Sequence, residues 1–451
     1  MAITRRQFVT RLGALAAAVG FSQADVSKLA EAFAGNATDL GGVAGKPRVV
    51  WVHGAECTGC STSLLGILES AGGKPFPTDP TYGGVSTLTA LGLAGINNTA
   101  SLNVITGDPL LSLWGGPTGF SANLNAIEGT DQVNIADVVI DVVDLMYHET
   151  VMGMGGDLAA NWLDEFTTAP TGLFVLVVEG ALQDKAQGGA WGDVSDPDVS
   201  WCSIGCSDDW NGTIGFEIDM PDTVVALANS ANCLAVVPIG QCASYGGYPG
   251  CKPPISAVTA AGFNPKLSQT GAMGVSDYLA SHGGLPSAGP FGTPIVNVPG
   301  CPTNPWWFVL TVVMFMSSAR DWLGVPGALD LVTASGLDSG GRLKMVYPVP
   351  VHGPYCPRYN AYTQAQFALK PGDPGCLQKI GCKGLSARSQ CGVHGWNNQQ
   401  PQNAGDSLCS TASGGTKPAG YFAGHCTKAG HPCMACTEKG YPDSFVPFVK
   451  A

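Results

Sequence analysis

The stretch VVWVHGAECTGC, residues 49–60, decides how the rest of this chain is interpreted. Its first four residues are apolar without any polar alternation, which is typical of a strand buried on both faces of a parallel sheet. The predicted strand, 49–53, ends with His53, Gly54 follows, and Cys57 and Cys60 then stand in the turn where such a strand ends. A buried strand that runs into a CxxC pair predicts a cysteine site at the edge of an α/β sheet.

Four further runs share the composition of this strand and are separated by segments long enough for helices. They are rich in Val and Ile and carry few polar residues. This alternation predicts an open, mostly parallel sheet with helices on both faces, which is an α/β fold. The runs are 138–144, 174–180, 233–240 and 294–300.

Two more cysteines follow strands of this predicted sheet. Cys242 comes two residues after the end of the fourth run and Cys301 directly after the fifth. Because parallel strands all end at the same edge, Cys57, Cys60, Cys242 and Cys301 are expected to meet there. Four thiolates suit zinc or a [4Fe–4S] cluster, and one CxxC with two isolated cysteines favours the cluster. The alternative is that Cys242 and Cys301 are ordinary buried cysteines.

The last third of the chain is a second region rich in metal-ligand residue types. It has little apolar periodicity and much glycine, so it needs metal clusters or disulfides to fold. One group of four ligands would be His352, Cys356, Cys376 and Cys382. A second group would be Cys391, Cys433 and Cys436, with Cys426 or Cys409 as a fourth member.

Composition restricts the classes of function. With 451 residues the chain has room for two or three domains, and it contains 16 cysteines. The net charge is −12 without a basic stripe, which argues against nucleic-acid binding. Charged residues make up only 12% of the chain. That scarcity fits either a surface covered by a partner or adaptation to an unusual milieu.

Residues 1–34 are predicted to be a targeting segment. Arg5 and Arg6 precede Phe8 and a weakly apolar stretch, and Ala32-Phe33-Ala34 forms a cleavage site of the A-x-A type. The pattern is typical of a twin-arginine signal, with an amphipathic helix as the alternative. It predicts export to the periplasm or the outer face of the cytoplasmic membrane. The apolar run 306–316 is about half the roughly 20 residues of a membrane span, so we expect a buried helix there and no transmembrane anchor in this chain.

Taken together, these stretches resemble the small subunits of nickel–iron hydrogenases from about Lys46 to Pro442. Each motif alone is weak, but their number and order are specific. The stretches that carry the resemblance are 51–60, 147–152, 174–180, 240–247, 299–310, 376–384 and 430–436.

The resemblance implies a flavodoxin-like domain over 46–330 and a loop-rich cluster domain over 340–451. It implies a proximal [4Fe–4S] cluster held by Cys57, Cys60, Cys242 and Cys301. It implies a distal [4Fe–4S] cluster held by His352, Cys356, Cys376 and Cys382. It implies a medial cluster, commonly [3Fe–4S], held by Cys391, Cys433 and Cys436, which would be [4Fe–4S] if Cys426 also ligates.

The resemblance also implies a function in electron transfer. The nickel–iron centre would belong to a separate large subunit, and this chain would carry electrons to a cytochrome or a membrane redox subunit without a catalytic residue of its own. The distal motif departs from the family's pattern, since His352 and Cys356 are separated by one residue more than usual. The alternatives are another exported iron–sulfur redox subunit and a secreted, disulfide-rich binding protein.

Overall fold

The computed structural model describes the greater part of the sheet and of the cysteine-rich region. Residues 1–47, which include the predicted targeting segment, lie outside the described residues. The described residues are 48–65, 144–168, 172–187, 200–206, 217–251, 270–304, 307–308, 311–312, 314–315, 318–319, 330–344, 346–347, 350–353, 356–389, 391 and 426–442.

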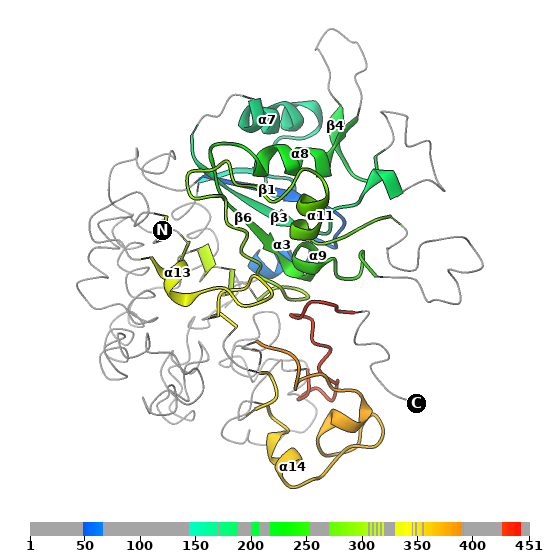
Figure 1. The fold of residues 1–451 in the computed structure, drawn as a ribbon. Coiled ribbons are helices and arrows are strands. Elements are labelled where there is room, and N and C mark those ends of the chain that lie inside the picture. Colours follow the sequence, from blue (N-terminus) through cyan, green and yellow to red (C-terminus); the bar gives the residue numbers. More distant parts are fainter. Residues whose placement is uncertain are drawn as a thin grey trace, which may run out of the picture.

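A parallel sheet forms the centre of the first part of the chain (Figure 1). Its strands stand in the order β2-β1-β3-β6. Parallel bridges from Val236 to Ile295 and from Ile239 to Val298 add the fifth predicted run beyond β6. The resulting order is the one of flavodoxin-like folds, so the predicted α/β class is confirmed. The strands are β1 (Arg48–His53), β2 (Asp144–His148), β3 (Phe174–Glu179) and β6 (Cys233–Ile239).

Two of the predicted strands differ in detail from those observed. The second was predicted over 138–144, whereas β2 runs from Asp144 to His148 and residues 138–143 lie outside the described part. The fifth, predicted over 294–300, contributes isolated bridges. The other three begin and end within one residue of their predicted bounds, because buried parallel strands are unbroken apolar runs.

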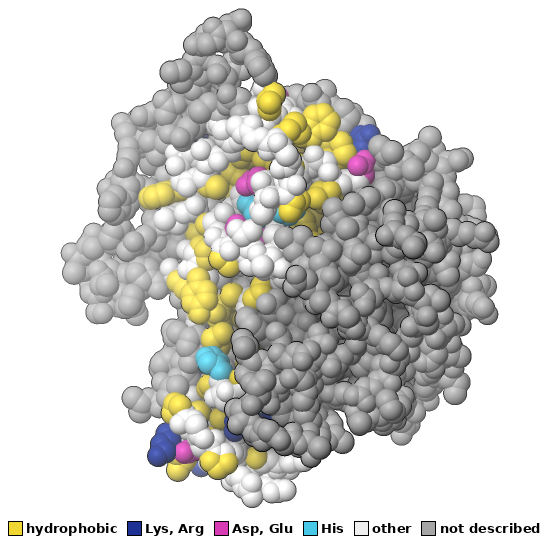
Figure 2. Space-filling view, turned by 180° about the vertical axis from the view of Figure 1, so that it is seen from behind, with side chains coloured by type: hydrophobic (Ala, Val, Ile, Leu, Met, Phe, Trp, Pro, Cys, Tyr) yellow, Lys and Arg dark blue, Asp and Glu magenta, His cyan; other side chains and the backbone are white. Residues whose placement is uncertain are grey.

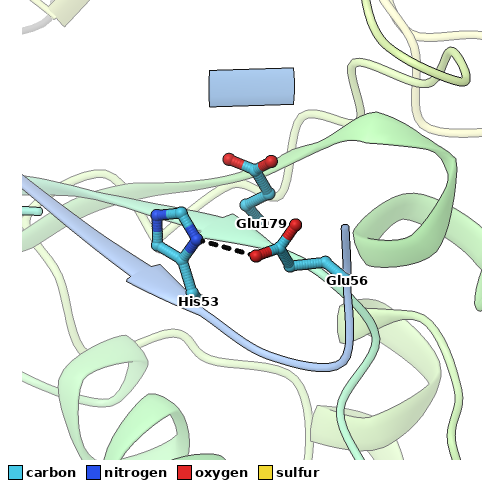
Figure 3. A group of neighbouring side chains, drawn as sticks. All are labelled: His53, Glu56 and Glu179. Atoms are coloured by element: carbon cyan, nitrogen blue, oxygen red, sulfur yellow. Dashed lines mark hydrogen bonds and ion pairs between the residues drawn. The ribbon is translucent and has the colours of Figure 1, made fainter. Parts of the chain in front are cut away.

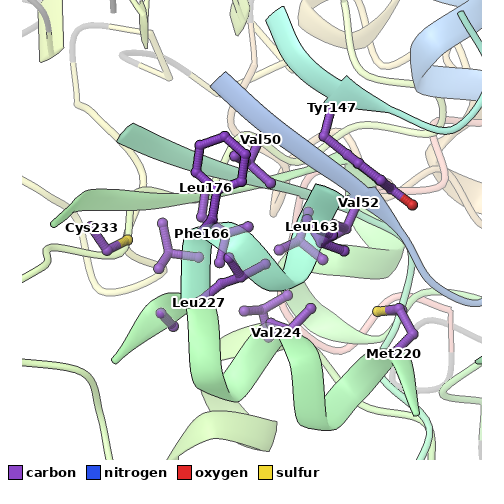
Figure 4. Close-up of a cluster of buried hydrophobic side chains, with 14 of the residues drawn as sticks. Val50, Val52, Tyr147, Leu163, Phe166, Leu176, Met220, Val224, Leu227 and Cys233 are labelled. Atoms are coloured by element: carbon purple, nitrogen blue, oxygen red, sulfur yellow. The ribbon is translucent and has the colours of Figure 1, made fainter. Parts of the chain in front are cut away.

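One face of the sheet packs against three helices to form the main apolar core (Figure 4). Val50 and Val52 of β1 and Leu176 of β3 point into this core. The helices are α7 (Gly156–Thr168), α8 (Met220–Ala228) and α11 (Val275–Ser281). A short antiparallel pair, β4 (Ser203–Cys206) and β5 (Glu217–Asp219), lies beside α7 and α8.

The opposite face carries Trp51, whose ring lies 5.3 Å from that of Phe308. Phe308 and the other described residues of 307–319 are helical, and all but the half-buried Val312 are buried, as expected for the apolar run. No helix in the described part of the chain is both long and apolar enough to cross a bilayer.

The sheet region ends in short helices at its carboxyl edge, and the cysteine-rich region consists mainly of loops. In Figure 1 the second region lies beyond the edge at which α3 and α9 begin. The short elements are α3 (Gly59–Leu65), η7 (Lys185–Gln187), α9 (Gly240–Tyr245), α13 (Leu331–Ser335), α14 (Tyr359–Thr363) and η8 (Leu377–Ile380).

A buried arginine joins the two regions. The Arg342 guanidinium forms ion pairs with Asp338 and Glu438, both at 2.8 Å, and donates to the carbonyl of Thr437 at 2.7 Å. The side-chain amide of Gln241 in α9 donates to the carbonyl of Glu438 at 2.9 Å. The loop after the sheet, helix α9 and the last cysteine pair are therefore held together by one polar network.

Candidate metal centres

The loop between β1 and α3 places the first cysteine pair. Gly54 and Gly180 meet at the end of β1 and β3, where a Cβ on Gly54 would lie 2.6 Å from the carbonyl oxygen of Ala181. Thr58, between the two cysteines, has a φ of 57°, which is an uncommon conformation for a non-glycine residue. This turn lets the chain pass from the strand to α3 and brings Cys57 and Cys60 to the sheet edge.

Three separate loops bring four thiols together at this edge. Burial raises the pKa of the Cys60 thiol well above its ordinary value, and the charges of Glu179, Cys242 and Cys301 raise it further. Burial likewise raises the pKa of Cys242 to about 12, with Cys301 and Cys57 adding to the effect. Each of the four predicted proximal cysteines therefore affects, or is affected by, the charge of another member of the group. Buried thiols this close resist ionisation unless a cation stabilises the thiolates.

Glycines leave room around these sulfur atoms. A Cβ on Gly59 would lie 2.9 Å from Sγ of Cys57, and one on Gly247 would lie 2.8 Å from Sγ of Cys242. A Cβ on Gly240 would approach Sγ of Cys60 even more closely. A site lined by thiols and kept free of side chains suits an inorganic cluster, so the residues present fit a [4Fe–4S] group.

The second predicted group is built from loops of the cysteine-rich region. Burial raises the pKa of Cys376, and the nearby Cys356 thiol adds to it. Burial also raises the pKa of Cys382, and the nearby Cys356 and Cys376 thiols add to this shift. A Cβ on Gly384 would touch both His352 and Sγ of Cys382, at 3.4 and 3.6 Å. The four predicted distal residues are thus neighbours.

His352 has the properties of a ligand. Its Nε2 atom is buried and has no hydrogen-bond partner among the described residues. Burial lowers the pKa of His352, which favours the neutral imidazole that binds metal. Its ring stands edge-on to the ring of Tyr362, with centroids 4.3 Å apart. An orphaned buried nitrogen beside three thiols fits a fourth ligand to iron.

The third group contains one cysteine more than the three that were assigned to it. Burial raises the pKa of Cys391, and Cys436 and Cys426 add to it. Burial raises the pKa of Cys436 to about 12, and the charge of Cys426 is the next largest cause of this shift. Burial and then the charge of Cys382 raise the pKa of Cys433, and the charges of Cys436 and Cys391 raise it further. Cys426 therefore lies with the three predicted medial cysteines, whereas Cys409 lies outside the described residues.

Contacts between backbone and sulfur link the three groups in a row. The backbone N–H of Cys301, in the first group, donates to the sulfur of Cys436 in the third. The backbone N–H of Cys433 donates to Sγ of Cys382, in the second group, at 3.3 Å. The order in space is therefore proximal, medial and distal, although the distal residues precede all of the medial ones in sequence.

Sequence reasoning missed the carboxylate that holds α3. The Glu179 carboxylate, at the end of β3, accepts the backbone N–H of Cys60 at 3.0 Å and that of Ser61 at 3.1 Å. It also accepts the hydroxyl of Ser61 at 2.5 Å. Burial raises the pKa of Glu179, and the hydrogen bonds from Ser61 oppose this shift. The available signal was a glutamate followed by glycine at the carboxyl end of a buried strand, where sites of α/β sheets form.

Glu179 belongs to a cluster of titratable side chains at the same edge (Figure 3). Strand pairing aligns His53 with Glu179, and His53 Nδ1 lies 3.1 Å from Glu56 Oε1. Burial opposes a charge on His53, but the hydrogen bond to Glu56 and the charge of Glu179 outweigh it and raise the pKa. These three residues offer ligand atoms within 4.8 Å of one another. Their bonds to each other and to α3 give them a structural role beside the first thiol group.

The remaining cysteines whose side chains the structure describes are not among the members of the three groups. Cys233 is fully buried in β6, as expected of a core residue. Cys202 is a thiol rather than half of a disulfide, and its Sγ lies 3.9 Å from the carbonyl oxygen of His53. The side chain of Cys206 lies outside the description. Cys251 lies 3.6 Å from the carbonyl oxygen of Gly247, next to the Cys242 loop.

Comparison with known proteins agrees with this arrangement. The family described as NADH ubiquinone oxidoreductase, 20 Kd subunit, matches residues 124–315, and the C-terminal family of the NiFe/NiFeSe hydrogenase small subunit matches 347–415. The periplasmic [NiFeSe] hydrogenase small subunit of Desulfomicrobium baculatum is 25% identical over 451 residues, covering 100% of both chains. The periplasmic [NiFe] hydrogenase small subunit 1 of Nitratidesulfovibrio vulgaris is 25% identical, covering 100% of this chain and 94% of the relative.

A solved structure shows the same likeness. A chain of the H2-activated [NiFeSe]-hydrogenase of Dm. baculatum aligns with a TM-score of 0.54 and 25% identity, covering 90% of this chain and 99% of that one. Fold, cysteine groups and comparisons define a subunit of an oxidoreductase of the hydrogenase class. Within that class, the relatives to which the chain is similar along its whole length are small subunits of [NiFe] and [NiFeSe] hydrogenases.

Proposed function

We propose that this chain carries electrons from hydrogen oxidation at the nickel–iron centre of a large subunit to an external acceptor. The observation that supports the proposal most is the row of three thiol groups, joined where Cys301 meets Cys436 and where Cys433 meets Cys382. Iron–sulfur clusters in these positions supply one-electron acceptors in series. The protein's part is to fix their order, burial and hydrogen bonding.

The donors aimed at the sulfur atoms support this role. The N–H of Thr303 donates to Sγ of Cys60 at 3.4 Å, and the N–H of Cys433 donates to Sγ of Cys382 at 3.3 Å. Such bonds stabilise the more reduced, more negative state and raise a cluster's potential. At the distal site the neutral His352 in place of a thiolate has the same effect, because it removes one negative charge from the ligand set.

We further propose that the medial site holds a [4Fe–4S] cluster. Cys426 is coupled to both Cys391 and Cys436, so four thiols are available where three would leave a [3Fe–4S] cluster. The proximal and distal sites, with four ligand residues each, are assigned [4Fe–4S] clusters. Iron and sulfide analysis of the isolated complex, with about twelve irons expected for three such clusters, checks this assignment.

The large subunit is proposed to dock beside the proximal site. Val151 and Met154 follow β2 at the same sheet edge and are 46% and 41% exposed. Exposed apolar side chains in a group indicate a contact surface. Because the relatives include periplasmic subunits, we propose that residues 1–34 direct export by the twin-arginine route to the periplasm or the outer face of the cytoplasmic membrane. A cytochrome or a membrane redox subunit would take the electrons there.

Changing Cys382 to Ala tests the electron path. Hydrogen-dependent dye reduction by the purified complex is expected to fall to background, while hydrogen–deuterium exchange at the partner's centre persists. The matched control is Cys202→Ala, which removes a half-buried thiol outside the three groups and should keep both activities. Unchanged dye reduction in Cys382→Ala would refute the path, and loss of both activities would show collapse of the assembly instead.

The alternative of a disulfide-rich binding protein receives no support from the structure. The described members of the three groups are thiols, and none of the described cysteines forms a disulfide. Visible absorption that bleaches on reduction of the anaerobically prepared complex would distinguish clusters from disulfides directly.

A further inference from the structure

The charge of the chain is divided very unevenly. The whole chain carries a net charge of −12, yet residues 340–451 contain eleven Lys and Arg against four Asp and Glu, a formal surplus of seven positive charges. The part of this stretch that holds the distal residues, 350–391, has Asp373 as its one acidic residue. The distal site therefore stands in a basic region of an acidic protein.

Several of these basic residues stand close to the predicted distal ligands along the chain. Lys379 lies in η8, between Cys376 and Cys382, and its ammonium lies 4.8 Å from the ring centre of Phe367. Lys383 follows Cys382 directly, and Lys370 stands two residues after Ala368, whose N–H donates to the carbonyl of Cys376. Figure 2 shows Lys and Arg side chains gathered at the far end of the cysteine-rich region.

Within the described part of the chain, no ion pair involves the side chains of Lys370, Lys379 and Lys383. Lys370 and Lys379 are exposed, and none of the described carboxylates lies within ion-pair distance of these three ammonium groups. The Asp373 carboxylate accepts the backbone N–H groups of Leu369 and Lys370. The positive charges are thus presented to whatever covers this surface.

Apolar side chains stand among the charges. Leu369 is 74% exposed and Leu385 is 48% exposed, and both flank the loops that carry the distal residues. An exposed apolar contact with charged residues around it is the composition of transient protein interfaces, in which the charges steer the encounter. We call Lys370, Lys379, Lys383, Leu369 and Leu385 the basic exit surface.

We propose that the basic exit surface docks a redox protein that presents an acidic face. This inference rests on the proposed function, because the distal site beneath the surface must pass its electrons outward. An anionic lipid bilayer could satisfy the same charges, but a bilayer that covered the site would insulate it, whereas an acidic redox protein accepts the electron. A second explanation is that the lysines neutralise the negative charge of the proposed distal cluster. That role does not require ammonium groups that face the solvent.

Charged inorganic acceptors test the surface on the intact complex of both subunits. Hydrogen reduces ferricyanide with release of protons, so that H2 and two [Fe(CN)6]3− give two H+ and two [Fe(CN)6]4−. At low ionic strength the anionic ferricyanide should be reduced faster than at high ionic strength, and the cationic [Ru(NH3)6]3+ should show the opposite salt dependence. This measurement needs no variant and is therefore independent of any folding defect.

The double variant Lys370→Glu/Lys379→Glu then locates the effect. Its ferricyanide rate at low salt is expected to fall by about tenfold and its [Ru(NH3)6]3+ rate to rise. Lys185→Glu, which reverses an exposed charge in the sheet region, is the matched control and should change neither rate. Hydrogen–deuterium exchange should be the same in all three proteins.

Each other outcome contradicts a different claim. Equal salt dependence for the two acceptors, or an unchanged double variant, overturns the basic exit surface. Lysine-dependent binding to phosphatidylglycerol vesicles without an acceptor-charge effect would overturn it in favour of a membrane contact. A wild-type complex without hydrogen–deuterium exchange and without iron would instead refute the proposed function itself.

Discussion

The sheet region and the cysteine-rich region are stabilised in different ways. In the sheet region, one apolar core draws on four strands and on helices α7, α8, α11 and α9. In the cysteine-rich region the described apolar clusters are small: one consists of Val351, Ala387 and Ala435, and the other of Ala368, Leu377 and Ile380. Burial of apolar side chains accounts for the stability of the sheet region, but these two clusters are too small to account for that of the cysteine-rich region.

Approximate energies support this contrast. Full burial of a large apolar side chain contributes roughly 1.5–3 kcal/mol, and alanine contributes less. Ordering the backbone costs about 1–2 kcal/mol for each residue. Two clusters of three residues cannot offset that cost over residues 356–389. We therefore expect the proposed clusters, held by the thiol and imidazole groups, to order these loops.

The largest expected effect follows from removing the metal. Anaerobic treatment of the complex with an iron chelator should increase amide hydrogen exchange in 356–389 and 426–442 by about 100-fold or more, because the loops lose the groups that order them. Strands β1, β3 and β6 should keep their protection, because their core does not depend on metal. Mass spectrometry of the exchanged peptides measures both. Equal loss in the two regions would contradict the division.

The second prediction alters the room around one thiol. In Gly240→Ala the new Cβ would crowd Sγ of Cys60, and the φ of 84° at this position adds backbone strain. We expect the complex to lose about four irons and its hydrogen-dependent dye reduction.

Gly292→Ala is the matched control for this change. Its φ is 72°, and nothing lies within 4 Å of the added Cβ. It should cost about 1–2 kcal/mol of stability and leave the iron content unchanged. Equal iron loss in the two variants would mean that backbone strain, rather than crowding of the thiol, is responsible.

The sequence predicted the parts of the molecule whose signal is local. Three strands were placed within one residue, because short runs rich in β-branched residues and followed by glycine, such as 174–179 and 233–239, favour a buried strand over a buried helix. The meeting of Cys57, Cys60, Cys242 and Cys301 followed from the rule that parallel strands end at one edge. Their roles as ligands, like the domain bounds 46–330 and 340–451, remain predictions.

The parts that could not be predicted depend on contacts between distant segments. Glu179 reads in the sequence like any glutamate that ends a strand, and only the pairing of β1 with β3 sets it against Cys60 and Ser61. The sequence left the fourth medial residue open between Cys426 and Cys409, because a long separation along the chain says nothing about distance in space.

The third prediction concerns Arg342, which joins the two regions. Arg342→Met removes a buried cation and leaves Asp338 and Glu438 without it, which should cost about 3–5 kcal/mol of stability. Lys185→Met is the control, because its ion pair with Asp222 is exposed and should be worth about 0–1 kcal/mol. Chemical denaturation of the complex measures both. A loss for Arg342→Met no larger than that of the control would show that the regions are joined by other contacts.

The smallest expected effect is a pH dependence at the edge where the regions meet. Burial and then the charge of His53 lower the pKa of His148 to about 4. The neutral ring uses both nitrogens, since the N–H of Thr150 donates to Nδ1 and Ser61 Oγ lies 3.2 Å from Nε2. The folded protein therefore takes up the proton of His148 at lower pH than the unfolded chain does.

The sign of the effect follows from this difference. The stabilisation is complete above the ordinary pKa of 6.5 and is lost as the pH falls from 6.5 toward 4, with a limit of about 3 kcal/mol. His53 has the opposite sign, because its raised pKa favours the folded state at low pH. His148→Gln keeps a hydrogen-bonding side chain that does not titrate, so the stability difference between wild type and variant isolates His148. Thermal unfolding between pH 7.5 and 5 should show this difference shrinking as the pH falls. A constant difference would mean that the pKa of His148 is the same in the folded and unfolded states.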